Sequence, residues 1–123
     1  MSAHDIWQTV RQHSLGRRTF HPMTASTYPS GSNSPAKVVY SDANIVGSHC
    51  YTILGWDYIG GTEYILLRNP WGNTEATKYN YTGTTVVYDI SWWRTINFAP
   101  NDGTFAMTTT GFKDYFASFG VVQ

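Results

Sequence analysis

Two residues with the chemistry of a proton-transfer site stand in neighbouring apolar stretches of the chain. His49 opens the run "HCYTILGW", and Asn69 closes the run "EYILLRN". An imidazole has an ordinary pKa of about 6.5, so His49 can take up and return a proton near neutral pH. A side-chain amide can accept a hydrogen bond from one ring nitrogen and leave the other free to face a thiol, as in a Cys-His-Asn triad. The pair therefore predicts a general base and the amide that orients it.

The three residues after Asn69 are suited to support such a pair. Pro70 stops the strand and removes a backbone donor, and Gly72 permits a tight turn. Trp71 can then fold back and shield the hydrogen bond between Asn69 and His49 from water, which strengthens that bond. An alternative interpretation of His49 is a partly buried side chain that hydrogen-bonds to a backbone carbonyl. The presence of Asn69 favours the catalytic interpretation.

The nucleophile is the missing part of this triad. Cys50 is the only cysteine in the sequence. Successive side chains of a strand point to opposite faces, so we expect the Cys50 thiol to point away from the His49 ring. We expect Cys50 to be a small buried hydrophobic residue. The chain thus carries a base and an orienting amide but no attacking group, and we expect no peptidase activity from it alone.

The elements that must position these residues are mainly β-strands. Gly60-Gly61 predicts the tight turn of a hairpin, and an antiparallel hairpin would bring its outer ends, at His49 and Asn69, close together. Apolar or alternating runs predict the remaining strands. The strands that we expect cover residues 36–41, 49–56, 57–69 with the turn inside it, 84–93 with a break near Ser91, 103–108 and 117–123.

Two helices accompany these strands in the prediction. Residues 2–15 form the first, in which Ser2 and Asp5 resemble a capping box. Its inward face would carry Ile6, Trp7 and Val10, and Gly16 would end it. Residues 109–116 form a short second helix, whose inward residues are Phe112, Tyr115 and Phe116.

Residues 17–36 are predicted to be a long loop with one short strand at 23–27. Together, the expected strands and helices predict an α+β fold that is mostly antiparallel β. We expect it to form a single domain over residues 1–123.

The composition argues against two classes of function, nucleic-acid binding and membrane association. The 123 residues include eight basic and eight acidic side chains, and charged residues make up only 13%. No charged pole therefore points to nucleic acid or to an anionic membrane. The sequence shows no signal peptide and no apolar run near the roughly 20 residues that span a bilayer, which leaves the location unknown and slightly favours the cytoplasm.

The motifs resemble those of one family. The stretch "GSHCYTILGW" followed by "EYILLRNPWGNTEA" resembles the "GHAY…LRNPWG" segment of the calpain family of cysteine proteases. The stretch "NDGTFAMTTTGFKDYF" is similar to the calpain pattern "DGEFWMSFEDFLRHF". Papain-like proteases share the His and an Asn before Trp-Gly, but they usually have Ser where Pro70 stands here and lack the Asp-Gly-x-Phe tail. The resemblance covers roughly residues 38–120.

The resemblance implies that the chain is the second, β-rich half of a calpain-like protease core. His49 would then be the catalytic base, Asn69 its orienting residue, and Trp71 the cover over the pair. The nucleophilic Cys and the oxyanion-stabilising Gln belong to the first half, which is absent from this sequence. The implied partners are that Cys-bearing half and a protein or peptide substrate, with no nucleic acid and no membrane.

The resemblance also implies a place for calcium. Animal calpains carry a calcium site in this half, and Glu75 and Asp102 align with two of its acidic ligands. Thr104 stands where the third acid would be. Calcium takes about six to eight oxygen ligands, so two carboxylates would make a weak site, and both residues also fit ordinary surface and turn positions. No other cofactor is expected.

Two other functions are compatible with the sequence. A non-catalytic binding or scaffold module of calpain-like fold would retain His49 and Asn69 for structure. A carbohydrate-binding β-sandwich would explain the aromatic content of 16%, with Trp92-Trp93 as the candidate stacking residues. On a strand, however, those two rings would face opposite sides.

Overall fold

The computed structural model describes residues 1–89, 92–98 and 102–121. Its helices are α1 (Ala3–Gln12), α2 (Tyr40–Ala43) and α3 (Thr109–Tyr115), with a 3-10 turn at Gly31–Asn33. Its strands are β1 (Ser14–Leu15), β2 (Arg18–Thr27), β3 (Cys50–Ile59), β4 (Thr62–Arg68), β5 (Asn80–Tyr81), β6 (Thr84–Asp89), β7 (Trp92–Asn97), β8 (Thr104–Thr108) and β9 (Phe116–Val121).

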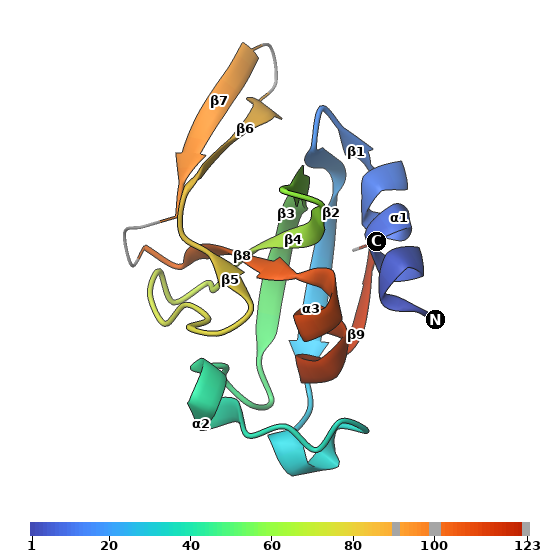
Figure 1. Ribbon diagram of the computed structural model, residues 1–123, viewed down its shortest axis with the longest axis vertical. Coiled ribbons are helices and arrows are strands. Elements are labelled where there is room, and N and C mark those ends of the chain that lie inside the picture. The colour runs from blue at the N-terminus through green and yellow to red at the C-terminus, as the bar shows by residue number, and fades with distance from the viewer. Residues whose placement is uncertain (90–91, 99–101, 122–123) are drawn as a thin grey trace.

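Seven of these strands form one antiparallel sheet (Figure 1). Their order is β1-β2-β3-β4-β8-β5, and β9 also pairs with β2. Strands β6 and β7 form a separate two-stranded antiparallel sheet. The predicted α+β class, mostly antiparallel β with an N-terminal helix and a short C-terminal helix, is therefore confirmed.

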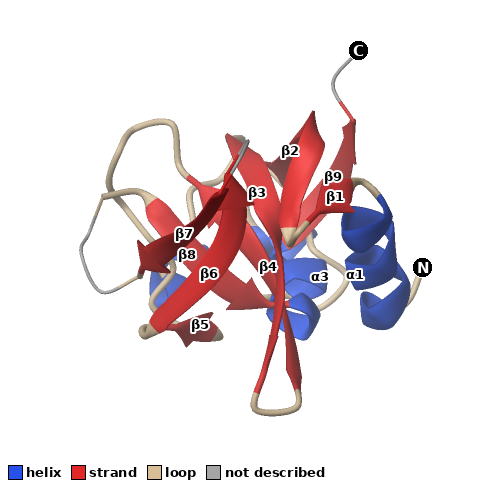
Figure 2. Cartoon of the chain, turned by 90° about the horizontal axis from the view of Figure 1, so that it is seen from above, coloured by secondary structure: helices blue, strands red, loops and turns tan. Residues whose placement is uncertain are grey.

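The core lies mainly on the face of the large sheet that α1 and α3 cover (Figure 2). Alternate residues of a strand face opposite sides, so Ile65 and Leu67 join this core while Leu66 does not. Leu66 instead packs with Ala106 and Phe98 in a smaller cluster on the other face. None of the described helices is long and apolar enough to cross a membrane.

Helix α1 begins as its sequence predicts. The Ser2 side chain accepts a hydrogen bond from the Asp5 backbone N–H, and the Asp5 carboxylate accepts from the Ser2 N–H. This reciprocal box satisfies donors that the first turn of a helix otherwise leaves unpaired. The apolar face of Ile6, Trp7 and Val10 is buried, as predicted.

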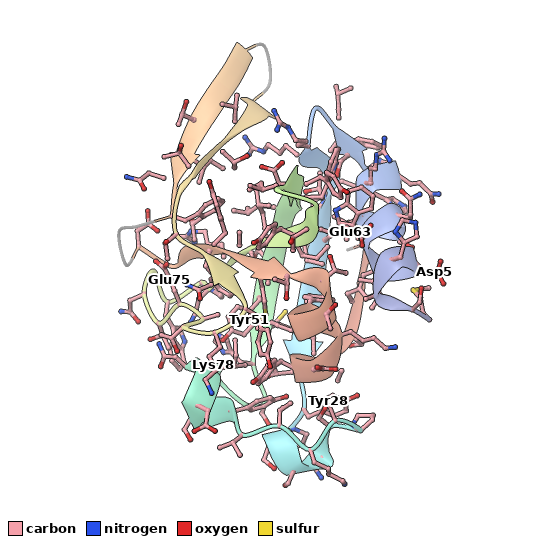
Figure 3. All side chains as sticks on the ribbon, in the orientation of Figure 1. Asp5, Tyr28, Tyr51, Glu63, Glu75 and Lys78 are labelled. Atoms are coloured by element: carbon pink, nitrogen blue, oxygen red, sulfur yellow. The ribbon has the colours of Figure 1, made fainter. Side chains whose placement is uncertain are left out.

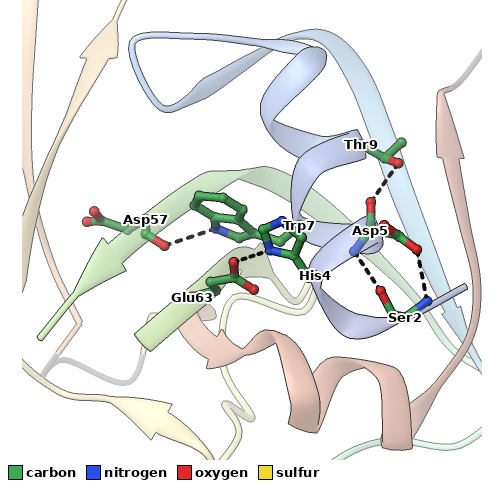
Figure 4. A network of polar contacts seen from close by, with 7 residues as sticks. All are labelled: Ser2, His4, Asp5, Trp7, Thr9, Asp57 and Glu63. Carbon is green, nitrogen blue, oxygen red and sulfur yellow. Dashed lines mark hydrogen bonds and ion pairs between the residues drawn. The ribbon is translucent and has the colours of Figure 1, made fainter. Parts of the chain in front are cut away.

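Two polar contacts fasten α1 to the hairpin of β3 and β4 (Figure 4). The Trp7 indole N–H donates to the Asp57 carbonyl oxygen over 3.1 Å. The His4 ring Nδ1 lies 2.5 Å from the Glu63 carboxylate. Because both partners belong to the hairpin that carries His49 and Asn69 at its open ends, α1 holds the far end of that hairpin.

The hairpin turn itself forms where predicted. Ile59 pairs with Thr62, and the two residues between them have positive φ: 58° for Gly60 and 82° for Gly61. Glycine adopts this conformation without steric cost, so the local sequence specifies the two-residue turn.

The first helix is shorter than predicted. It ends at Gln12 rather than near residue 15. Gly16 does not end it; Gly16 and Arg17, with φ of 58° and 71°, form the turn between β1 and β2. The chain leaves the helix early because Ser14 pairs with β2 instead of continuing the last turn.

The long loop predicted over residues 17–36 is wrong for its first half. Arg18–Thr27 is one ten-residue strand rather than a loop with a short strand at 23–27. It pairs with β1 at Arg18 and Thr19, with β3 at Arg18 and Met23–Ser26, and with β9 at Met23–Thr27. Met23 and Ala25 are buried there. These pairings join segments distant in sequence, so they override the polar, proline-containing local pattern.

The strand predicted over residues 36–41 is also wrong. Tyr40–Ala43 forms one helical turn instead, ended by Asn44 in the left-handed conformation at φ 58°. The Tyr40 hydroxyl donates to the Tyr115 carbonyl over 2.7 Å. This tertiary contact and the Asn44 cap favour a turn where the apolar letters alone suggest a strand.

The predicted strand over residues 84–93 is two strands that pair with each other, Thr84 opposite Asn97. The predicted break near Ser91 lies outside the described residues. The side chains of Trp92 and Trp93 also lie outside the described part, so their suggested sugar-stacking role stays a prediction.

Candidate active site

The open end of the β3–β4 hairpin brings His49 and Asn69 together. His49 directly precedes β3 and Asn69 directly follows β4, and the last cross-strand pair before them is Thr52 with Arg68. The His49 ring Nε2 lies 2.9 Å from the Asn69 side-chain oxygen Oδ1. The contact that the hairpin pattern predicts is therefore present.

The Asn69 amide has a fixed orientation. Asn69 is fully buried, with no exposed surface. Its Oδ1 accepts a hydrogen bond from the Trp71 backbone N–H over 3.1 Å, and its Nδ2 donates to the Thr74 carbonyl over 3.2 Å. A flipped amide would place like groups against each other at both contacts, so Oδ1 faces His49.

This orientation sets the tautomer of the His49 ring. An amide oxygen only accepts hydrogen bonds, so Nε2 must carry the proton. The other ring nitrogen, Nδ1, then holds a lone pair in the neutral ring. Within the described residues Nδ1 has no hydrogen-bond partner. The site can therefore accept a proton at Nδ1 while Asn69 holds Nε2–H.

The Asn-Pro-Trp-Gly segment forms a tight turn around this amide. The Gly72 N–H donates to the Asn69 carbonyl over 2.9 Å, and Gly72 has φ 76°. Pro70 occupies the second position of the turn, where its fixed φ is favourable. The turn brings the Trp71 ring to 4.6 Å from the His49 ring, between centroids. Trp71 is 57% exposed, so it covers the histidine and also presents a large apolar surface to solvent.

Thr27 fixes the backbone of His49. The His49 N–H donates to the Thr27 hydroxyl over 2.9 Å, and the Thr27 N–H donates to the His49 carbonyl over 3.0 Å. The same hydroxyl donates to the Val46 carbonyl over 2.7 Å. The ring of Tyr51 lies edge-on to the His49 ring at 5.0 Å. Sequence reasoning missed Thr27, because only the register of β2 against β3 brings it to His49.

Cys50 corrects one prediction. It is exposed, not a buried hydrophobic residue. The His49 and Tyr51 rings touch each other on one face of the strand, so the side chain between them points to the opposite face. That face is not covered by α1 or α3 at this end of the sheet, which explains the exposure. The predicted separation of the thiol from the imidazole agrees with this geometry.

An exposed thiol should react in the folded chain. We expect iodoacetamide to alkylate Cys50 without denaturant, and Cys50→Ser to change the free energy of unfolding by less than about 0.5 kcal/mol, as for other exposed positions. Mass spectrometry of the native and the urea-unfolded chain measures the first effect. Labelling only after unfolding would contradict the exposed placement.

The carboxylates of Glu75 and Asp102 lie next to each other at the turn that precedes β8 (Glu75 is labelled in Figure 3). Glu75 Oε2 accepts a hydrogen bond from the Gly103 N–H over 3.0 Å, and Asp102 Oδ1 accepts from the Thr104 N–H over 3.1 Å. Partial burial raises the pKa of Glu75, the backbone N–H groups of Gly103 and Asp102 oppose that rise, and the nearby Asp102 charge adds to it.

These two side chains are an incomplete set of calcium ligands. Within the described residues, no group of three or more His, Cys, Asp or Glu side chains is placed to hold a metal ion. Calcium takes about six to eight oxygens, and both carboxylates already accept backbone hydrogen bonds. Calcium binding at Glu75 and Asp102 stays a prediction.

Comparison with known proteins finds similarity to a protease over part of the chain. No protein-family model matches the chain. An alignment 75 residues long, which covers 58% of the chain, is 32% identical to a thiol protease of Porphyromonas gingivalis. The matched segment covers 15% of that protein, so the chain spans a small part of its length. The similarity supports a protease-like module and does not single out the calpain family.

Proposed function

We propose that this chain is the His/Asn-bearing subdomain, residues 1–123, of a calpain-like cysteine endopeptidase core. The observation that carries the proposal is the 2.9 Å contact between His49 Nε2 and Asn69 Oδ1, which leaves Nδ1 as the free base. The similarity to a thiol protease supports the same class of chemistry. A protein or peptide would be the substrate.

The two residues have distinct roles in this mechanism. His49 Nδ1 takes the proton of a cysteine thiol, and the thiolate attacks the carbonyl carbon of the scissile peptide bond. The imidazolium then donates that proton to the leaving amine as the C–N bond breaks. Water, deprotonated by His49, releases the acyl group from the sulfur. Throughout, Asn69 Oδ1 accepts from Nε2–H and keeps the ring in one orientation.

The nucleophile must come from outside this sequence. Cys50 is its only cysteine and points to the face opposite His49. We infer that a Cys-bearing first half of the protease core docks over the open end of the β3–β4 hairpin, where the exposed Trp71 ring would lie in the contact. Without that half we expect no hydrolysis.

Complementation tests this proposal. The chain is assayed on a fluorogenic peptide substrate, alone and with a separately produced Cys-bearing half of a calpain-like core. We expect no turnover by the chain alone, turnover by the mixture, and a loss of at least about a hundredfold with His49→Ala, the usual scale for a general base. Cys50→Ala serves as the matched control and should leave the turnover of the mixture unchanged.

Two outcomes would contradict the proposal. Turnover by the highly purified Cys50→Ala chain alone would require a nucleophile that the triad argument does not contain. A mixture whose activity is indifferent to His49→Ala would remove the base from the mechanism. A mixture that binds tightly but never hydrolyses the substrate would favour a non-catalytic module of the same fold.

A further inference from the structure

The loop that follows the Asn-Pro-Trp-Gly turn forms hydrogen bonds with two other segments, the end of α2 and the turn that precedes β8. The Asn44 side chain donates to the Glu75 carbonyl over 2.9 Å, and the Thr77 N–H donates to the Ala43 carbonyl over 3.0 Å. The backbone at Glu75 is thus held against the end of α2. The Glu75 side chain instead contacts the turn that precedes β8, on the side away from α2 in the chain of hydrogen bonds.

The Glu75 side chain reaches the orienting amide residue in two steps. Its Oε2 accepts from the Gly103 N–H over 3.0 Å. The carbonyl oxygen of Gly103 accepts a hydrogen bond from the Asn69 backbone N–H over 2.8 Å. Gly103 therefore stands between the carboxylate and the residue that holds the His49 ring.

Gly103 packs closely against the turn that begins at Asn69. A Cβ at Gly103 would lie 2.8 Å from the Asn69 carbonyl oxygen and 2.9 Å from the Gly72 Cα. Gly103 is buried. Since the two backbone segments touch directly, a displacement of Gly103 must displace Asn69 with it.

We infer that Glu75 is a positioning residue: its carboxylate holds Gly103 through a backbone hydrogen bond, and Gly103 in turn holds Asn69 in the orientation that fixes the His49 tautomer. The inference rests on the proposed function, in which that tautomer is the working form of the base. It gives Glu75 a role that needs no bound ion, because the partner of its Oε2 is a backbone N–H group.

Nuclear magnetic resonance of the labelled full chain tests this at a pH where His49 is neutral. We expect Glu75→Ala to speed hydrogen exchange at the Asn69 backbone N–H about fivefold, because one net hydrogen bond contributes about that factor. We also expect the His49 ring to change from the Nε2–H tautomer to a mixture of both tautomers. Glu75→Gln keeps an oxygen for the Gly103 N–H and should retain both values. Glu63→Gln, at the far end of the hairpin, is the matched control and should change neither.

A direct measurement covers the case in which Glu75→Ala fails to fold. In the wild-type chain, scalar coupling across hydrogen bonds should link the Gly103 nitrogen to the Glu75 carboxyl carbon, and the Asn69 nitrogen to the Gly103 carbonyl carbon. If either coupling is missing while those of the β3–β4 pairs are detected, the inference is wrong. An unchanged His49 tautomer in folded Glu75→Ala would overturn it as well.

Calcium chloride added to the same sample gives an independent outcome. Loss of the coupling between Gly103 and Glu75 on addition of calcium would show that Glu75 serves as a cation ligand, which would overturn the inference. An unchanged coupling supports it. None of these readouts depends on hydrolysis, so the failure of complementation and the failure of the positioning role remain distinguishable.

Discussion

Asn69→Ala is expected to destabilise the fold by about 2–4 kcal/mol and to release the His49 ring. Three groups lose their partner in one substitution: His49 Nε2–H, the Trp71 N–H and the Thr74 carbonyl. A polar group left without a partner inside the protein costs about 1–3 kcal/mol, and these three groups face the fully buried Asn69 side chain. Rearrangement that admits water would offset part of the sum, which sets the upper bound.

Urea unfolding of Asn69→Ala and of the wild-type chain measures this effect. Asn73→Ala is the matched control, since Asn73 is an exposed asparagine in the same loop and, among the described residues, its side chain hydrogen-bonds to Thr74 alone. We expect the control to change the free energy of unfolding by less than about 0.5 kcal/mol. Equal stabilities of the two variants would mean that the hydrogen bonds of the Asn69 amide do not stabilise the fold.

Gly103→Ala is expected to cost about 2–5 kcal/mol of stability. A non-glycine residue in the left-handed region costs about 1–2 kcal/mol, and Gly103 has φ 92°. The added methyl group would also overlap the Asn69 carbonyl oxygen at 2.8 Å, and overpacking of this kind costs about 1–3 kcal/mol more. The strained segment is the one that holds Asn69, so His49 should lose its single tautomer as well.

Gly61→Ala separates the two causes. Gly61 also has positive φ, 82°, but a Cβ there would meet nothing within 4 Å. We expect it to show only the conformational cost, so the difference in unfolding free energy between the two variants measures the overlap at the site. If Gly61→Ala costs as much as Gly103→Ala, the close packing of Gly103 against Asn69 contributes nothing.

The parts of this site that the sequence predicts are those with local signals. Gly60-Gly61 specifies the hairpin turn, and the hairpin by itself brings His49 and Asn69 together. Pro70 and Gly72 specify the turn that folds Trp71 back. The capping of α1 by Ser2 and Asp5 is likewise a matter of neighbouring residues. In each case the signal lies within a short stretch of neighbouring residues.

The parts that the sequence does not predict depend on distant pairings. Strand β2 looks like a loop until β3 and β9 pair with it, and only that register places Thr27 on the His49 backbone. The contact of Glu75 with Gly103 joins two turns that no local pattern connects. Cys50 is exposed because helices cover only one face of the sheet, which alternation alone cannot reveal.

The protonation pattern of the His49 ring is the most direct test of the central claim, that this chain carries a pre-formed base awaiting a thiol. Nitrogen-15 resonance of the neutral ring in the wild-type chain distinguishes the two ring nitrogens. We expect a proton on Nε2, hydrogen-bonded to Asn69, and no proton on Nδ1. A proton on Nδ1, or a ring that averages between the two tautomers, would contradict it.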